Sequence, residues 1–324
     1  MKQFLTVVFG GLAAIGLGIA ISYAGSLAWP EVSPKLKSIG GPLLSAVAES
    51  IAGKPDDGTS ISGIVRTIRF TANEEEDISF AASRALPVNL KKGITAEAYI
   101  VKDLSANGTA ISREPDRLLP IASVTKLVTA AVARKLIALD TKITLDRSIM
   151  AAYGNTADFR VGETFTAGDL IYPLLMVSSN DTAEAYAQSY GRAKFIAAMN
   201  DFTQSIGAYR TYFADPSGLS PKNVSTANDL ALIIGWIRQN DPGIIDITQL
   251  KTKTVRAHTW VNPTHFLSMS NYVGGKNGYT PEADRTAVSL FSKGPKKDLY
   301  AIVVLGSDER DSDEMQLLGM IGKK

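Results

Sequence analysis

An unbroken apolar segment opens the chain. No charged residue occurs from position 3 to position 30, and Trp29 stands near the far end of the run. As a helix, such a segment is longer than the hydrocarbon core of a bilayer, which is about 30 Å thick. Small residues at 22–24 and 26–28 also fit the cleavage site of a signal peptide. We predict a membrane anchor over residues 1–30, with a cleaved signal peptide as the alternative, and both would export the rest of the chain.

The hydrophobic pattern is weak from residue 31 to residue 85. Turn-forming glycine and proline residues gather at 53–58, and an acidic run occupies 74–77. Neither feature carries chemistry, and the segment contains no internal repeat. We predict that residues 31–85 are an extracytoplasmic connector and that residues 86–324 form the functional domain.

Regular alternation of apolar and polar residues begins near Ile94. Residues 96–101 have the pattern of a strand, and Asn107-Gly108 favours the tight turn of a hairpin. Residues 286–291 and 300–305 have the same pattern near the other end of the domain. We therefore predict strands at both ends of the domain, with the last two forming a pair.

Helical periodicity fills the middle of the domain. Five helices are predicted. The first begins at the SxxK motif described below and ends near residue 139, and the second begins at a capping box formed by Thr166 and Asp169. The others span 192–207, ending at Gly207, and 226–239, with Ser225 as cap, and the last begins at Asp313. Strands at both ends with helices between them predict an α+β layer fold.

Composition narrows the chemistry. The chain is 45% hydrophobic and 20% charged, as in ordinary folded proteins. Its net charge of +2 gives no broad basic field for nucleic acid. The absence of cysteine excludes disulfides, thiolate nucleophiles and cysteine–metal sites. Two histidines, His258 and His265, occur without an HExxH motif, which argues against a zinc mechanism, and we expect no metal and no cofactor.

The first candidate motif is an SxxK sequence formed by Ser123 and Lys126. On a helix, residues three positions apart share a face, so the lysine amine would lie within reach of the serine hydroxyl. A neutral amine could take the hydroxyl proton, and burial or a nearby cation lowers a lysine pKa enough to permit it. Alone, the motif is also consistent with a surface serine and lysine.

Two further motifs follow along the chain. Ser178-Ser179-Asn180 is an SxN sequence that ends an apolar run, and it would also suit a turn between helices with an N-cap. Lys276-Asn277-Gly278 follows two glycines, and it would also suit a glycine-rich hairpin turn.

The three motifs together have the order found in penicillin-binding proteins. The chain resembles the low-molecular-weight D-alanyl-D-alanine carboxypeptidases, the serine peptidases of family S11. Residues 120–127, 215–219 and 225–231 carry much of this resemblance, which covers roughly residues 86–321. It implies a β-lactamase/transpeptidase-like α+β fold, with an antiparallel sheet flanked by helices and a helical subdomain, behind the N-terminal membrane helix.

The resemblance also implies roles for single residues. Ser123 is the expected nucleophile and Lys126 its base. Ser178 would relay a proton to the leaving amine, and Asn180 would bind the substrate amide. The backbone N–H groups of Ser123 and Tyr279 would form the oxyanion hole. The expected substrate-binding residues are Lys276, Asn277, Gly278, Tyr279 and Arg310, with Lys276 and Arg310 placing positive charge near the substrate carboxylate.

The third motif departs from the family pattern at Asn277, where threonine is usual. An asparagine amide can donate a hydrogen bond to a carboxylate as a threonine hydroxyl does, but from a longer side chain. We expect this residue to alter substrate fit and catalytic efficiency rather than the fold.

The motifs predict a serine-type D-Ala-D-Ala carboxypeptidase and leave two other functions open. A D,D-endopeptidase that cuts cross-links would use the same residues. A non-catalytic peptidoglycan-binding scaffold would keep the fold, with Asn277 as its only support. A class A β-lactamase needs a glutamate that activates the deacylating water, and none lies between Glu184 and Glu282. No GxSxG elbow supports a Ser-His-Asp hydrolase.

The predicted function sets the expected partners and location. The partners are peptidoglycan stem peptides as substrates, β-lactams as inhibitors and the membrane through residues 1–30, with no nucleic acid. The expected location is the cell membrane, with a single span and an extracytoplasmic catalytic domain. Secretion after signal cleavage is the alternative.

Overall fold

The computed structural model describes residues 7–8, 20–21 and 93–322. The chain divides into two units, Met1–Leu86 and Pro87–Lys324. In the first unit, the described residues form one antiparallel pair, β1 (Val7–Val8) and β2 (Ala20–Ile21). The predicted anchor lies mostly outside the described residues, and the predicted connector lies wholly outside them. Within the described ranges, no helix combines the length and the apolar character needed to cross a bilayer.

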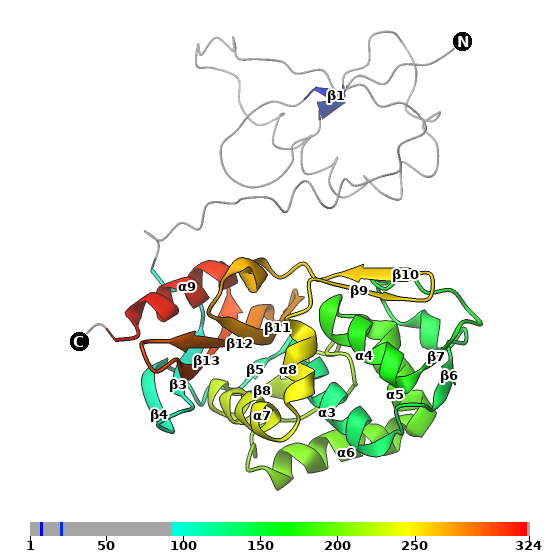
Figure 1. Cartoon of the computed structure of the whole chain (residues 1–324), viewed down its shortest axis with the longest axis horizontal. Coiled ribbons are helices and arrows are strands. Elements are labelled where there is room, and N and C mark those ends of the chain that lie inside the picture. Colours follow the sequence, from blue (N-terminus) through cyan, green and yellow to red (C-terminus); the bar gives the residue numbers. More distant parts are fainter. Residues whose placement is uncertain (1–6, 9–19, 22–92, 323–324) are drawn as a thin grey trace. The chain divides into compact units, whose positions relative to one another are not determined.

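A five-stranded antiparallel sheet is central to the second unit (Figure 1). Its spatial order is β11 (Tyr272–Thr280), β12 (Asp284–Lys293), β13 (Asp298–Ser307), β3 (Ala98–Asp103) and β4 (Gly108–Arg113). The hairpin predicted at Asn107-Gly108 is confirmed by the pairing of β3 with β4. The strand pair predicted at 286–291 and 300–305 is confirmed by β12 and β13. The lysine–asparagine–glycine motif lies within the edge strand β11, so it is not a hairpin turn.

Helices cover both faces of this sheet (Figure 1). On one side, α7 (Ala227–Asn240) and α8 (Pro242–Thr248) pack on the sheet. The helices α3 (Lys126–Leu136), α4 (Ala167–Met176), α5 (Asn180–Tyr190) and α6 (Arg192–Ser205) pack against these two and against one another. On the other side lies α9 (Arg310–Met320), packed on β12 and β13. The α+β layer fold predicted from the sequence is therefore confirmed.

Short elements complete this unit. They are the 3₁₀ turns η2 (Ala122–Thr125), η3 (Ile149–Ala151) and η4 (His265–Ser268), and the antiparallel pairs of β5 (Leu119–Pro120) with β8 (Val224–Ser225), β6 (Lys142–Thr144) with β7 (Thr164–Thr166), and β9 (Thr252–Val255) with β10 (His258–Val261). One of them, η2, packs against the edge strand β11 and carries Ser123.

Two of the predicted helix caps can be compared with the structure. The capping box is confirmed at α4, where Thr166 Oγ1 accepts from Asp169 N at 3.1 Å and Asp169 Oδ2 accepts from Thr166 N at 3.3 Å. The cap predicted for α7 is wrong by one residue. Thr226 is the N-cap, because its side chain accepts from Asp229 N, whereas Ser225 belongs to β8.

The last helix also begins earlier than predicted. α9 starts at Arg310, three residues before Asp313. Charged residues in its first turn concealed the helical pattern, because the apolar side chains that pack on the sheet, Leu317 and Leu318, occur only in its second half.

The sheet is buried on both faces, and its side chains alternate between two cores. On β12, Val288 and Leu290 belong to the core shared with the helices of the larger layer. Ala287 and Phe291, which alternate with them, belong to the core shared with α9. Because directly paired residues in a sheet point to the same face, the register of β12 fixes which side each residue of β11 faces.

Asp313 ties α9 to the start of the domain. This fully buried carboxylate accepts hydrogen bonds from Thr95 N at 2.9 Å, Thr95 Oγ1 at 2.8 Å, Ala96 N at 2.9 Å and Ser307 Oγ at 2.6 Å. All four donors bond to the Asp313 carboxylate, so removal of this carboxylate would leave buried donors without an acceptor.

We predict that Asp313→Ala destabilises the domain by about 2–4 kcal/mol, because each buried donor left without a partner costs about 1–3 kcal/mol before relaxation. Urea unfolding followed by circular dichroism measures this change. Asp201→Ala removes an exposed carboxylate from α6 and serves as the matched control. Equal stability of the two variants would contradict the structural role of Asp313.

Candidate active site

Three segments distant in the sequence meet at Ser123. Lys126 lies at the start of α3, and the distance from its Nζ to Ser123 Oγ is 2.8 Å. The same Nζ is 2.7 Å from Asn180 Oδ1 at the start of α5 and 2.7 Å from the carbonyl oxygen of Ser217. The structure therefore brings together the predicted Ser123, Lys126 and Asn180.

The partners of Lys126 determine what its amine can do. The amide oxygen of Asn180 and the carbonyl oxygen of Ser217 can only accept hydrogen bonds. A neutral amine has two N–H groups, which those two oxygens satisfy, and one lone pair, which then faces the Ser123 hydroxyl. In this state the Ser123 O–H donates to Lys126, and the amine is placed to act as a general base.

The electrostatics of the site favour that neutral state. Lys126 is fully buried, and this burial is the main cause that places its pKa well below the ordinary value for lysine. The positive charge of Lys276 lowers the pKa of Lys126 further, while Asp215 raises it. Burial and the neighbouring Arg310 in turn lower the pKa of Lys276 to about 7.

The second motif occupies the turn between α4 and α5. Ser178 has a φ of 60°, and Ser179 caps α5 by accepting from Thr182 N at 3.1 Å. Asn180 is fixed at both ends of its amide, because its Nδ2 donates to the carbonyl oxygen of Tyr153 at 2.6 Å. Ser178 Oγ is buried and has no hydrogen-bond partner among the described residues, so it is not bonded to Ser123 or Lys126. Its predicted role as a proton relay remains a proposal.

The third motif divides its side chains between the two faces of β11. Lys276 pairs with Val288 and Gly278 with Thr286, which places both on the side of Ser123. Asn277 pairs with Ala287 and faces α9 instead. Lys276 is 5% exposed, and its Nζ donates to the carbonyl oxygen of Asn277 at 2.7 Å.

Gly278 lets the strand backbone approach the nucleophile. A Cβ atom at this position would lie 2.7 Å from Ser123 N and 2.9 Å from Ala122 Cβ, closer than real Cβ contacts allow. Thr286, which is paired with Gly278, donates from Oγ1 to the carbonyl oxygen of Ile121 at 3.0 Å. The backbone N–H of Ser123 therefore lies beside the strand that carries Tyr279, as an oxyanion hole would require.

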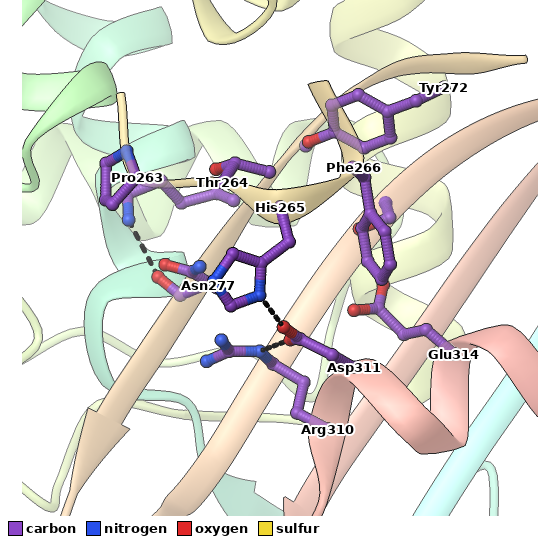
Figure 2. Close-up of a pocket in the computed structure, with 12 residues that line it drawn as sticks. Pro263, Thr264, His265, Phe266, Tyr272, Asn277, Arg310, Asp311 and Glu314 are labelled. Atoms are coloured by element: carbon purple, nitrogen blue, oxygen red, sulfur yellow. Dashed lines mark hydrogen bonds and ion pairs between the residues drawn. The ribbon is translucent and has the colours of Figure 1, made fainter. Parts of the chain in front are cut away.

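Asn277 and Arg310 line a common cavity on the α9 side of β11 (Figure 2). Arg310 Nε donates to Asp311 Oδ1 at 2.9 Å, and His265 Nδ1 lies 2.9 Å from Asp311 Oδ2. Asp311 thus stands between the two basic side chains and orients the guanidinium group of Arg310. The other histidine, His258, lies on β10 with its Nε2 3.0 Å from Glu163 Oε1.

The loop at residues 215–220 is a part of the site that the sequence motifs did not predict. Asp215 holds this loop, because its Oδ1 accepts from Ser217 N at 2.6 Å and Gly218 N at 2.7 Å, and its Oδ2 accepts from Ser220 N at 2.6 Å. This folding presents the Ser217 carbonyl to Lys126. The aspartate followed by Ser217-Gly218 is a turn pattern visible in the sequence, but a backbone carbonyl leaves no signature of its role.

Gly218 fixes the same loop against the nucleophile. Its φ is 88°, in the left-handed region, and a Cβ atom there would lie 1.9 Å from the carbonyl oxygen of Ala122. Only glycine meets both conditions at this position. The peptide between Ala122 and Ser123 is therefore packed between Gly218 and Gly278.

Comparison with known proteins agrees with this arrangement. The family described as D-alanyl-D-alanine carboxypeptidase matches residues 84–309. A D-alanyl-D-alanine endopeptidase of Pseudomonas aeruginosa is 35% identical over 191 residues, which cover 56% of this chain and 59% of the relative. An endopeptidase of the same name from Escherichia coli is 33% identical over 187 residues, covering 55% of this chain and 57% of the relative. The chain thus spans less than two thirds of the length of these two relatives.

Solved structures show the same fold. The crystal structure of D-alanyl-D-alanine carboxypeptidase from Mycobacterium tuberculosis has a TM-score of 0.64 and 28% identity, covering 70% of this chain and 90% of that one. A mutant of the Streptomyces K15 DD-transpeptidase has a TM-score of 0.64 and 26% identity, covering 71% and 97%. The transpeptidase-like fold expected from the sequence is therefore confirmed for the domain.

We predict that Lys276→Met raises the pKa of Lys126, because it removes the positive charge that lowers it. Ser123 should then react more slowly at low pH, and the acid side of its rate profile should move to higher pH. The measurement is the pH dependence of Ser123 acylation by a β-lactam, with the position of the profile as the readout rather than its height. Lys222→Met removes an exposed lysine and is the control. Superimposable profiles for Lys276→Met and wild type would refute this coupling.

Proposed function

Because the chain belongs to the D-alanyl-D-alanine carboxypeptidase family of serine peptidases, family S11, we propose that it cleaves the terminal D-Ala-D-Ala bond of peptidoglycan stem peptides. The observation that carries the proposal is the amine of Lys126, which faces two hydrogen-bond acceptors and the Ser123 hydroxyl. Such an amine has its lone pair directed at the nucleophile.

The reaction starts with attack of Ser123 Oγ on the carbonyl carbon of the penultimate D-Ala, while the hydroxyl proton moves to Lys126 Nζ. The negative charge that forms on the carbonyl oxygen is stabilised by the N–H groups of Ser123 and Tyr279. The C–N bond then breaks, and the departing amine takes a proton that Lys126 supplies through Ser178. Water hydrolyses the resulting ester, which releases the shortened peptide and restores the Ser123 hydroxyl.

Substrate capture takes place around β11 in this proposal. Asn277 and Arg310 bind the terminal carboxylate on the α9 side of the strand. Lys276 places positive charge nearby, and Gly278 lets the peptide backbone lie close to Ser123. Asn180 hydrogen-bonds the substrate amide through the second N–H of its amide, since Tyr153 accepts the first.

A second candidate function is cleavage of cross-links between stem peptides. It is favoured by the two relatives from Pseudomonas aeruginosa and Escherichia coli, which bear the name endopeptidase. The acyl group and its attack by Ser123 are the same in both reactions. Only the leaving amine differs, because it is a free D-alanine in one case and the side-chain amine of a second stem peptide in the other.

Partners and location complete the proposal. Peptidoglycan stem peptides are the substrates, and β-lactams are inhibitors because their ring carbonyl acylates Ser123. Residues 1–30, with no charge from position 3 onward, would anchor the chain in the cell membrane. The catalytic domain would then lie outside the cytoplasm.

We predict that a fluorescent penicillin labels the protein covalently, and that Ser123→Ala abolishes the label. Ser112→Ala removes an exposed serine on β4 and should keep it. Mass spectrometry of digested peptidoglycan then separates the candidates. Loss of one alanine indicates carboxypeptidase action, split cross-links indicate endopeptidase action, and unaltered fragments from a labelled protein contradict both. Full labelling of the Ser123→Ala protein would refute the choice of nucleophile.

We also predict that protease added to spheroplasts degrades the domain beyond residue 30, because the apolar segment would hold it outside the membrane. Immunoblotting with an antibody to the C-terminal helix follows the loss. A cytoplasmic protein blotted in parallel reports membrane integrity. Complete protection of the domain while the added protease digests a known outer-surface protein would exclude this topology.

A further inference from the structure

A small cavity lies behind the edge strand, on the side of α9 (Figure 2). Its volume is about 40 Å³. A buried water needs roughly 10–15 Å³ of such space, so the cavity has room for about three waters. Its polar lining comes from η4, β11, β12 and α9, through His265, Asn277, Ser289, Arg310, Asp311 and Glu314.

Glu314 is a buried carboxyl group in this cavity that the proposed reaction does not use. Its side chain is 1% exposed, and Ser289 hydrogen-bonds the carboxyl group. The second oxygen, Oε1, has no hydrogen-bond partner among the described residues. A buried oxygen without a protein partner, next to a cavity of this size, is a binding position for water.

Charged groups approach Glu314 from two elements. Arg310, Asp311 and Asp313 lie on its own helix, and Lys276 lines the cavity from β11. Titratable or polar groups also face it from three elements: Tyr272 on β11, His265 on η4 and Ser289 on β12. Of the nearby carboxylates, Asp311 is paired with Arg310, and Asp313 accepts its four hydrogen bonds at the other side of the helix.

The protonation state of Glu314 affects the total charge of the groups that line the cavity. Arg310 and Asp311 form an ion pair beside the cavity, and His265 contacts the same carboxylate. Lys276 adds a positive charge that fades as pH passes its pKa of about 7. An ionised Glu314 would add a negative charge to that balance. Burial, the largest cause, raises the pKa of Glu314 to about 8, which keeps it neutral at physiological pH.

We propose that Glu314 is a specificity-determining residue that must carry its proton for the site to accept a substrate carboxylate. The protonated group lines the same cavity as Asn277 and Arg310, and it adds no negative charge there. When Glu314 ionises, its charge repels the carboxylate. This inference rests on the proposed function, which places the substrate carboxylate at Asn277 and Arg310.

The test measures binding rather than turnover. In a Ser123→Ala protein, calorimetry compares a peptide ending in D-Ala-D-Ala with its C-terminal amide, at about pH 6 and about pH 9. Affinity for the carboxylate peptide should fall between these values. Loss of the Lys276 charge contributes to the fall in both proteins. At about pH 9 the double variant that adds Glu314→Gln should bind the carboxylate peptide roughly tenfold more tightly than the Ser123→Ala protein, because glutamine cannot ionise, so its fall is smaller.

Two controls isolate the charge of Glu314. Glu309→Gln removes an exposed carboxylate at the start of α9 and should keep the full fall. The C-terminal amide should bind equally to the proteins with and without the Glu314→Gln substitution, since the amide carries no charge. An unchanged fall in the Glu314→Gln protein, or the same difference with the amide, overturns the inference while leaving the proposed function in place. Failure of every variant to bind either peptide refutes the proposed function, and the inference with it.

Thermal unfolding supplies a second readout. The pKa of Glu314 is raised by folding from 4.5 to about 8. The folded state therefore binds more protons than the unfolded state. The contribution of Glu314 to the free energy of unfolding is lost as pH rises from 4.5 to about 8. Glu314→Gln should flatten that part of the stability curve. Parallel curves for the two proteins would show that Glu314 is not held protonated, and would overturn the inference.

Discussion

A primary amine buried beside two oxygens that only accept hydrogen bonds, and facing one hydroxyl, is the constraint on which the site depends. The Lys126 side chain is removed from water, and a charge there would need a closely paired anion. Asp215, whose charge raises the pKa of Lys126, has both carboxylate oxygens hydrogen-bonded to the backbone of its own loop. The neutral amine is therefore the favoured state, and α3, α5 and the loop at 215–220 must stay in place together to supply its two acceptors.

The nucleophile itself is held by backbone contacts more than by side chains. Gly218 and Gly278 approach the peptide before Ser123 from two directions, at distances that no Cβ atom would permit. Ala122 has a φ of 46°, which a non-glycine residue adopts only under constraint from its surroundings. The position of Ser123 is thus set by a loop and a strand that lie far from it in the sequence.

Hydrophobic alternation is a local signal, so the sequence allowed the fold class and the strands at both ends of the domain to be predicted. The spacing of Ser123 and Lys126 is local too, whereas their meeting with Asn180 was implied by the resemblance to a known family. The face on which Asn277 lies follows from its register with Ala287, which only the folded sheet reveals. The carbonyl of Ser217 could not be found, since backbone groups have no residue-specific signature. Glu314 was also out of reach, because its burial depends on packing between α9 and the sheet, and the charged first turn of that helix hid its start.

Edge strand β11 separates two tasks that meet at one substrate. Its side toward η2 adjoins Ser123, and its side toward α9 adjoins the cavity that binds the leaving portion in the proposed reaction. Substitutions behind the strand can therefore alter which leaving group is accepted while the nucleophile stays untouched. Under the proposed function, α9 and η4 are therefore the elements through which a lineage would change its choice of cell-wall bond, and Asn277 lies on their side of the strand.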